Sequence, residues 1–168
     1  DNLVYVSDTL NHRVQTFRPI VSPINYKTII IAGGGPYPGN DLWESTQICA
    51  NFAYRALTYQ GFTKETIYYL SSDLDLDLDS NGVLDDVDGD VTYEALESAV
   101  NWASDSETLV VYLVDHGGNG TFRMSGDETL SVEELDSLLD SLQENASCKV
   151  IVVYDACESG SFISNMQP

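Results

Sequence analysis

Positive charge is what this sequence has least of. Its 168 residues include 7 Lys and Arg against 27 Asp and Glu, which gives a formal net charge of −20. Binding to nucleic acid or to an anionic membrane surface needs clustered basic side chains, so neither partner is expected. The chain also contains no apolar run of about 18 residues, the length that would predict a membrane span.

Cysteine and histidine are nearly as scarce. Three cysteines, Cys49, Cys148 and Cys157, are too few for a disulfide framework and lack the paired spacing of zinc ligands. One of them is therefore free to serve as a reactive thiol. Hydrophobic residues make up 43% of the chain, which predicts a globular domain with a core rather than a disordered segment.

Residues 1–19 differ in pattern from the residues that follow. They read as two short strands joined by a turn, and the segment YVSDTLNHRVQTF resembles part of one NHL repeat of a β-propeller. A single repeat cannot bury its own apolar face, so the segment is interpreted as a hairpin or as the end of an upstream propeller. His12 belongs to this pattern and is assigned a structural role. Residues 20–26 are interpreted as a linker, and residues 27–168 as one domain.

That domain alternates between apolar runs and helical patterns. Four continuous apolar runs predict strands that are buried on both faces, namely Thr28–Ala32, Thr66–Leu70, Leu109–Val114 and Val150–Tyr154. Helices are predicted over 43–60, after Thr92, and after a capping box at Ser131–Glu134. The alternation predicts an α/β fold in which a mostly parallel sheet lies between layers of helices. Cys49 falls on the apolar stripe of the first helix and is predicted to lie in the core.

Two residues that can carry chemistry follow the last two of these strands. His116 comes soon after the run that ends at Val114, and Cys157 comes soon after the run that ends at Tyr154. Active residues of an open parallel sheet collect at the carboxyl ends of its strands, and neighbouring strands lie about 5 Å apart. A nearby imidazole gives a cysteine the thiolate character that it needs to attack a carbonyl carbon. The placement therefore predicts His116 as general base and Cys157 as nucleophile, with the N–H groups of Gly117 and Cys157 donating to the oxyanion.

The two motifs resemble those of a known peptidase family. The segments VDHG, residues 114–117, and DACESGS, residues 155–161, are similar to the paired motifs of legumain-like cysteine peptidases in the caspase-like clan. The similarity covers residues 27–163. It implies a caspase-like three-layer αβα sandwich and peptide hydrolysis through a thioester on Cys157. It also implies that Asp155 lines the specificity pocket and that Asn40 orients the histidine. Asn40 is predicted to be one of the substrate-binding residues as well.

Two features depart from the family pattern. Legumains carry an arginine–histidine pair after the first strand that contributes to asparagine recognition, whereas the comparable segment, residues 40–46, has no arginine. An acidic pocket containing Asp155 and Asp41 would instead favour a basic side chain. Caspase-like folds also have further strands after the cysteine, so the fold is expected to be incomplete after Pro168. A further C-terminal segment or a second chain is the expected partner.

Much of the negative charge is concentrated in an acidic loop, residues 73–90. Within it, residues 77–88 have oxygen-bearing side chains at the spacing of a calcium loop, with a glycine at the sixth position and an acid at the twelfth. The segment DLDSNGVLDDVDG also resembles the calcium repeats of extracellular adhesive proteins. Without a cation, so many carboxylates would repel one another. The ligands predicted for a structural Ca²⁺ are Asp77, Asp79, Asn81, the Val83 carbonyl, Asp85 and Asp88.

The sequence leaves three functions open. The first is a calcium-stabilised, legumain-like cysteine endopeptidase that acts on peptide or protein substrates. The others are a non-catalytic calcium-binding surface or adhesion module with the same fold, and a domain that cleaves only its own chain. Single calcium loops usually bind weakly and suit a calcium-rich exterior, so an extracellular, cell-surface or periplasmic location in a prokaryote is expected.

Overall fold

The computed structural model describes residues 4–8, 13–17, 25–163 and 166. Strands β1 (Val4–Asp8) and β2 (Arg13–Phe17) form an antiparallel ribbon within the segment whose sequence predicts a hairpin. The similarity of this segment to an NHL repeat stays a prediction. His12 and residues 20–24 of the predicted linker lie outside the described residues.

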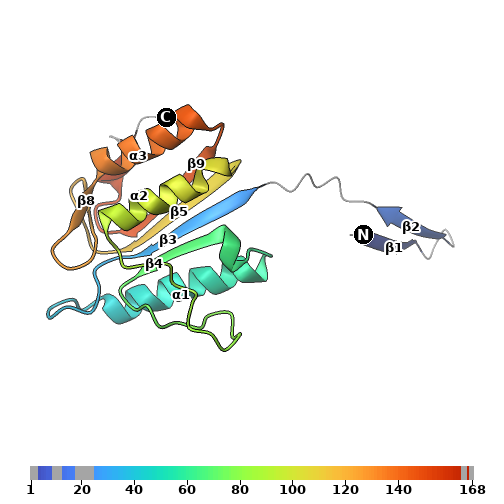
Figure 1. Ribbon diagram of the computed structural model, residues 1–168, viewed down its shortest axis with the longest axis horizontal. Coiled ribbons are helices and arrows are strands. Elements are labelled where there is room, and N and C mark those ends of the chain that lie inside the picture. The colour runs from blue at the N-terminus through green and yellow to red at the C-terminus, as the bar shows by residue number, and fades with distance from the viewer. Residues whose placement is uncertain (1–3, 9–12, 18–24, 164–165, 167–168) are drawn as a thin grey trace.

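A four-stranded parallel sheet forms the middle of the domain (Figure 1). Its strands lie in the spatial order β4-β3-β5-β9. Their bounds are β3 Tyr26–Ala32, β4 Ile67–Ser71, β5 Thr108–Asp115 and β9 Lys149–Ala156. Each strand contains one of the predicted apolar runs, apart from a shift of one residue at the start of β4. β3 is buried at every position after Tyr26, because it has a strand on each side and helices over both faces.

Helices cover both faces of the sheet, with α1 on one side and α2 and α3 on the other (Figure 1). The helices are α1 Trp43–Tyr59, α2 Tyr93–Trp102, α3 Val132–Asn145 and α4 Gly160–Ile163, with 3-10 turns η2 Lys64–Thr66 and η3 Ala103–Asp105. Alternate residues of β3 enter two separate cores. Ile29 and Ile31 pack in the core shared with α2 and α3, and Ile30 and Ala32 pack against α1. The predicted α/β fold with a mostly parallel sheet is confirmed.

The predicted helix starts are also confirmed. Thr92 Oγ1 accepts a hydrogen bond from the N–H of Ala95 at the start of α2. At the start of α3, Ser131 Oγ accepts from Glu134 N–H, while the Glu134 carboxylate accepts from Ser131 N–H. Each cap satisfies N–H groups that the first turn of a helix cannot pair internally, and so fixes where the helix begins.

The buried face of α1 differs from the predicted one. Ile48 and Phe52, which are apolar residues on either side of Cys49, are 69% and 71% exposed. Cys49 is exposed too, so its predicted place in the core is wrong. The residues of α1 that are buried are Thr46, Ala50 and Tyr54.

Hydrogen bonds explain this rotation of α1. The Thr46 hydroxyl donates to the Asp115 carboxylate at 2.7 Å, and the Tyr54 hydroxyl donates to the Asp86 carboxylate at 2.5 Å. A buried hydroxyl costs little free energy once it is paired, so two polar residues can occupy the inner face of the helix. Hydrophobic spacing alone could not predict the face, because the acceptors come from distant segments.

A small antiparallel sheet follows β5 at its carboxyl end. Its strands, in the order β6-β7-β8, are Gly117–Gly118, Thr121–Arg123 and Thr129–Ser131. The loop after β3 is tied to this arm, because the N–H of Gly34 donates to the carbonyl of Met124 at 3.0 Å. The arm therefore lies over the ends of both β3 and β5.

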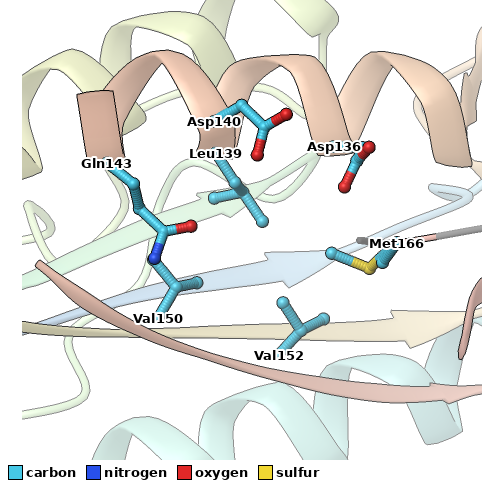
Figure 2. A pocket seen from close by; sticks show the side chains of 7 residues that line it. All are labelled: Asp136, Leu139, Asp140, Gln143, Val150, Val152 and Met166. Carbon is cyan, nitrogen blue, oxygen red and sulfur yellow. The ribbon is translucent and has the colours of Figure 1, made fainter. Parts of the chain in front are cut away.

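Strand β9 is an edge strand with both faces partly open. On one face, Ile151 and Val153 are 39% and 44% exposed. On the other, Figure 2 shows a groove between α3 and β9, with a volume of about 250 Å³. The groove is lined by Asp136, Leu139, Asp140, Gln143, Val150, Val152 and Met166. Within the part of the chain that the structure describes, no helix combines the length and the apolar character needed to cross a bilayer.

Candidate active site

The pairing of β5 with β9 brings His116 beside Cys157. The register sets Val114 opposite Asp155 and Asp115 opposite Ala156, so the next residue of each strand is His116 on one and Cys157 on the other. Neighbouring strands lie about 4.8 Å apart. Cys157 is exposed to solvent, and His116 is half-buried. The imidazole and the thiol predicted from sequence thus belong to the same rim of one sheet.

Asn40, in the loop between β3 and α1, selects the tautomer of the His116 ring. Its Nδ2 donates to the Gly35 carbonyl at 2.9 Å, and its Oδ1 accepts from Leu42 N–H at 3.0 Å, which orients the amide. The same Oδ1 lies 3.1 Å from His116 Nε2, so Nε2 carries the proton and donates it to this bond. A neutral ring then keeps its lone pair on Nδ1, which is the atom available to accept a proton from a thiol.

A buried carboxylate accepts a hydrogen bond from the backbone of the histidine. Asp115 is 4% exposed, and its Oδ1 accepts from the N–H of His116 at 2.6 Å. Its Oδ2 accepts from the Thr46 hydroxyl of α1 at 2.7 Å. A carboxylate is tolerated inside a protein when its oxygens are hydrogen-bonded, so these bonds fix the end of β5 against the start of α1. Thr46 was missed by the sequence analysis, because a threonine in a helix gives no signal of its distant acceptor.

The position after the histidine has room for glycine alone. A Cβ at Gly117 would overlap the carbonyl oxygen of Cys157, and it would lie 2.8 Å from the Tyr154 hydroxyl oxygen and 3.0 Å from the Ala156 Cβ. The Gly117 backbone therefore packs directly against the backbone that carries the thiol. Such contact is what the predicted sharing of an oxyanion by the two backbones requires.

The turn that carries Cys157 is held to the loop after β6. Glu158 has a φ of 57°, a left-handed conformation that is uncommon outside glycine, and it turns the chain from β9 toward α4. Ser161 Oγ accepts from the Gly120 N–H at 2.8 Å and donates to the Glu158 carbonyl at 2.7 Å. This hydroxyl joins the two backbone segments that flank the thiol.

Tyr154 lies under the same turn on the α3 side of the sheet. Its hydroxyl donates to the Thr121 carbonyl at 3.0 Å, and its ring centroid is 4.2 Å from that of Phe162. Burial raises the pKa of Tyr154 to about 12, and the negative charge that Cys157 can carry contributes in the same direction. The hydroxyl is therefore protonated at neutral pH.

Asp155 projects from β9 on the opposite face to Tyr154, where it is exposed. Its Oδ2 accepts from the Tyr112 hydroxyl at 3.1 Å, and burial, followed by this bond, raises the pKa of Tyr112. Asp155 lies two residues before Cys157, which follows the end of β9 in a turn. Asp41, the other acid predicted near the substrate, is exposed in the loop that also carries Asn40.

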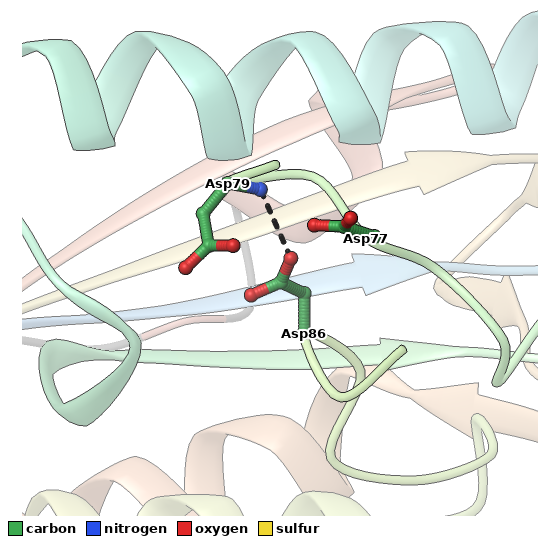
Figure 3. A group of neighbouring side chains, drawn as sticks. All are labelled: Asp77, Asp79 and Asp86. Atoms are coloured by element: carbon green, nitrogen blue, oxygen red, sulfur yellow. Dashed lines mark hydrogen bonds between the residues drawn. The ribbon is translucent and has the colours of Figure 1, made fainter. Parts of the chain in front are cut away.

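Three carboxylates converge in the acidic loop, as Figure 3 shows for Asp77, Asp79 and Asp86. One oxygen of each lies within 4.8 Å of the others. Asp86 is 1% exposed, and its oxygens accept from the Tyr54 hydroxyl and from the N–H groups of Leu78 and Asp79. Asp86 is not among the ligands predicted from sequence, because its burial depends on a tyrosine of α1 far away in sequence.

The other predicted calcium ligands have different surroundings. The Asp85 carboxylate forms an ion pair with Lys64, and this pairing raises the pKa of the lysine. Asp88 Oδ2 accepts from the N–H of Tyr69 at 2.8 Å. Asn81 bonds through its Nδ2 to Asp79, and its Oδ1 accepts from Val83 N–H. The cluster around Asp77 and Asp79 is therefore completed by Asp86 and not by Asp85 or Asp88.

Comparison with known families agrees with this geometry. A family model described as the Peptidase C13 family matches residues 83–168, which include His116 and Cys157. No curated protein matches the chain. Asn40, Asp41 and the first carboxylates of the acidic loop lie outside the matched residues.

Proposed function

The chain belongs to the Peptidase C13 family, and from that premise we propose that it is a cysteine endopeptidase that hydrolyses peptide bonds through a thioester on Cys157. Membership makes it a cysteine peptidase at family level, with peptides or proteins as substrates. The observation that carries the finer proposal is the register of β5 and β9, which sets His116 beside Cys157.

The proposed reaction has two halves. His116 Nδ1 takes the thiol proton, the Cys157 sulfur attacks the carbonyl carbon of the scissile bond, and the oxyanion accepts hydrogen bonds from the N–H groups of Gly117 and Cys157. The C–N bond then breaks, and the imidazolium gives its proton to the leaving amine. In the second half, His116 takes a proton from water, the hydroxide attacks the thioester, and the acid product leaves as the proton returns to sulfur.

Asp155 and Asp41 are proposed to face the substrate. Asp155 lies two residues before Cys157 near the end of β9, and its carboxylate is oriented by the Tyr112 hydroxyl. A carboxylate here would select a basic side chain on the acyl side of the scissile bond, because it would attract a cation and repel an acidic substrate. A peptide library with every residue type at that position tests this preference.

The cysteine chemistry is tested by a thiol-directed peptidase probe with a peptide recognition element. Cys157 should be labelled, and Cys157→Ala should abolish both labelling and peptide hydrolysis. His116→Ala should slow labelling and hydrolysis by at least about a hundredfold, because the thiol loses its general base.

Cys49→Ser is the matched control, since Cys49 is also exposed. This variant should be labelled and should hydrolyse peptides as the original protein does. Equal labelling of Cys49 and Cys157 without any hydrolysis would contradict the proposal and favour a non-catalytic surface module. Cleavage of the chain itself, with no cleavage of added peptides, would favour a self-processing domain.

We further propose that the acidic loop binds Ca²⁺ as a structural ion. Asp77, Asp79 and Asp86 offer the kind of hard oxygen ligands that calcium prefers, and Asp86 is already held by three donors. The net charge of −20 adds a general attraction for cations. A weak structural calcium site would suit a protein that works outside the cytoplasm, at the cell surface or in the periplasm.

A second proposed partner is a segment that covers β9. Its support is the exposure of Ile151 and Val153 on an edge strand, since an open apolar edge readily accepts another strand. A further segment of the same protein or a second chain could supply it. Protection of the β9 amides from hydrogen exchange, measured in a longer form of the protein and in residues 1–168, tests this proposal.

A further inference from the structure

A depression of about 200 Å³ lies at the carboxyl ends of β3 and β4. It is lined by Gly34, Gly35, Pro36, Tyr37, Ser72, Asp90, Ser125 and Gly126. The strand order β4-β3-β5-β9 puts the ends of β3 and β4 on the far side of His116 from Cys157. The depression and the thiol therefore flank the histidine from opposite sides.

The chemistry of the depression is set by one oriented carboxylate. Asp90 is exposed, and its Oδ1 accepts from the Ser72 hydroxyl and from Val91 N–H, both at 2.8 Å. Among the residues that the structure describes, its Oδ2 accepts from the Ser125 hydroxyl alone, at 3.2 Å. Two carboxylate oxygens can accept about four hydrogen bonds between them, so three donors leave capacity for one more. An ammonium or guanidinium group is a donor of the kind that would use this capacity.

Gly35, which lines the depression, also holds the asparagine that is hydrogen-bonded to His116. The Gly35 carbonyl accepts from Asn40 Nδ2, and Asn40 Oδ1 accepts from His116 Nε2. Gly35 has a φ of 84°, and a Cβ there would lie 2.7 Å from the Ser72 hydroxyl oxygen. Glycine thus lets the backbone approach the floor of the depression while its carbonyl holds the asparagine.

The chemistry of the proposed reaction decides which half of the substrate lies on the His116 side of the thiol. The acyl half of a substrate stays on the Cys157 sulfur, while the leaving amine must take its proton from the imidazole. That amine therefore lies on the His116 side of the thiol, and the peptide that follows it runs away from Cys157. The strand order puts the ends of β3 and β4, and the depression with them, on this same side of the thiol.

We infer that this depression is a subsite for a lysine or arginine side chain in the leaving half of the substrate, with Asp90 as its specificity-determining residue. The inference rests on the proposed peptidase function and adds a second point of recognition to it. Ser72 and Ser125 orient the carboxylate by donating to it. The subsite is separate from Asp155, which lies on the other side of the catalytic pair, on β9.

Paired internally quenched peptides test the subsite. The two members of each pair share one acyl half and differ at a single position of the leaving half, which holds either lysine or its uncharged analogue norleucine. At one of these positions the lysine peptide should be cleaved with a kcat/KM about tenfold higher, as expected for one hydrogen bond to a charged group. Asp90→Asn should bring the ratio of the two kcat/KM values close to one.

The ratio separates recognition from general damage, because misfolding lowers the cleavage of both peptides alike. Asp140→Asn, which removes an exposed carboxylate of α3, should leave the ratio unchanged and so controls for the overall negative charge. A ratio near one at every position of the leaving half, with both peptides cleaved, would overturn the subsite and leave the peptidase proposal standing. Failure to cleave any peptide would overturn the peptidase proposal, and the subsite with it.

Discussion

Asn40 Oδ1 accepts a hydrogen bond from His116 Nε2 at 3.1 Å, and the asparagine is itself held by Gly35 and Leu42. The first prediction follows from this pair. Asn40→Ala would free the ring to rotate and to exchange tautomers, so Nδ1 would be aligned with the thiol for only part of the time. We expect kcat to fall by about a hundredfold, the usual cost of a misplaced catalytic group, with a much smaller change in KM.

Rescue by a conservative variant distinguishes this positioning role from a loss of folding. Asn40→Asp, which keeps an acceptor oxygen, should recover part of kcat. Unchanged kcat in the alanine variant, with the fold intact by circular dichroism, would rule out the positioning role.

The second prediction concerns Gly117. Because a Cβ there would overlap the Cys157 carbonyl oxygen, Gly117→Ala should push the two strand ends apart. We expect the free energy of unfolding to fall by about 1–3 kcal/mol, as for other overpacked sites, and peptide hydrolysis to be lost. Urea unfolding and a peptide assay measure the two effects.

Gly89→Ala is the matched control for that substitution. A Cβ at Gly89 would meet only the Leu70 side chain, at an ordinary 3.7 Å, so the change should cost less than about 0.5 kcal/mol. If Gly117→Ala were as stable and as active as this control, the close approach of the two backbones would not matter to the site.

The neighbouring positions of His116 and Cys157 could be predicted from sequence because both residues follow long apolar runs, and parallel strands present their carboxyl ends at one edge. The same pattern predicts the four strands and the capped starts of α2 and α3. The face of α1 could not be predicted this way. Its buried hydroxyls, on Thr46 and Tyr54, depend on carboxylates that come from other segments, and no local spacing records that pairing.

The acidic loop shows the same limit. Spacing within the loop selects Asp85 and Asp88, yet Lys64 and the Tyr69 N–H engage their carboxylates. Asp86 is buried, where it accepts a hydrogen bond from the Tyr54 hydroxyl, and its carboxylate lies close to those of Asp77 and Asp79. A pattern match gives the chemical character of such a loop, whereas tertiary contacts decide which of its oxygens converge.

The third prediction is that Ca²⁺ stabilises the folded protein. At a free concentration of one hundred times Kd, binding to the folded state alone would add about 2.7 kcal/mol to the free energy of unfolding. Thermal unfolding with increasing CaCl₂, compared with the chelated protein, measures the gain. Asp79→Asn should weaken it, whereas Asp140→Asn on α3 should leave it intact. A melting temperature that does not respond to Ca²⁺, or responds equally in Asp79→Asn, would exclude the site.

The fourth prediction uses the Tyr54 hydroxyl, which donates to buried Asp86 at 2.5 Å. Burial, and then the neighbouring carboxylate, raises the pKa of Tyr54 in the folded state. A raised pKa means that the stabilising contribution is present below the unfolded value of about 10 and is lost as pH rises through the folded one. The free energy of unfolding should therefore decline above about pH 10.

Tyr54→Phe should lower the free energy of unfolding at neutral pH by about 1–3 kcal/mol, because Asp86 loses a donor, and should flatten the alkaline decline. Tyr59→Phe, at a position 89% exposed, should reproduce the original curve. Equal alkaline slopes for Tyr54→Phe and the unmodified chain, measured by urea unfolding, would show that this pair does not set the limit.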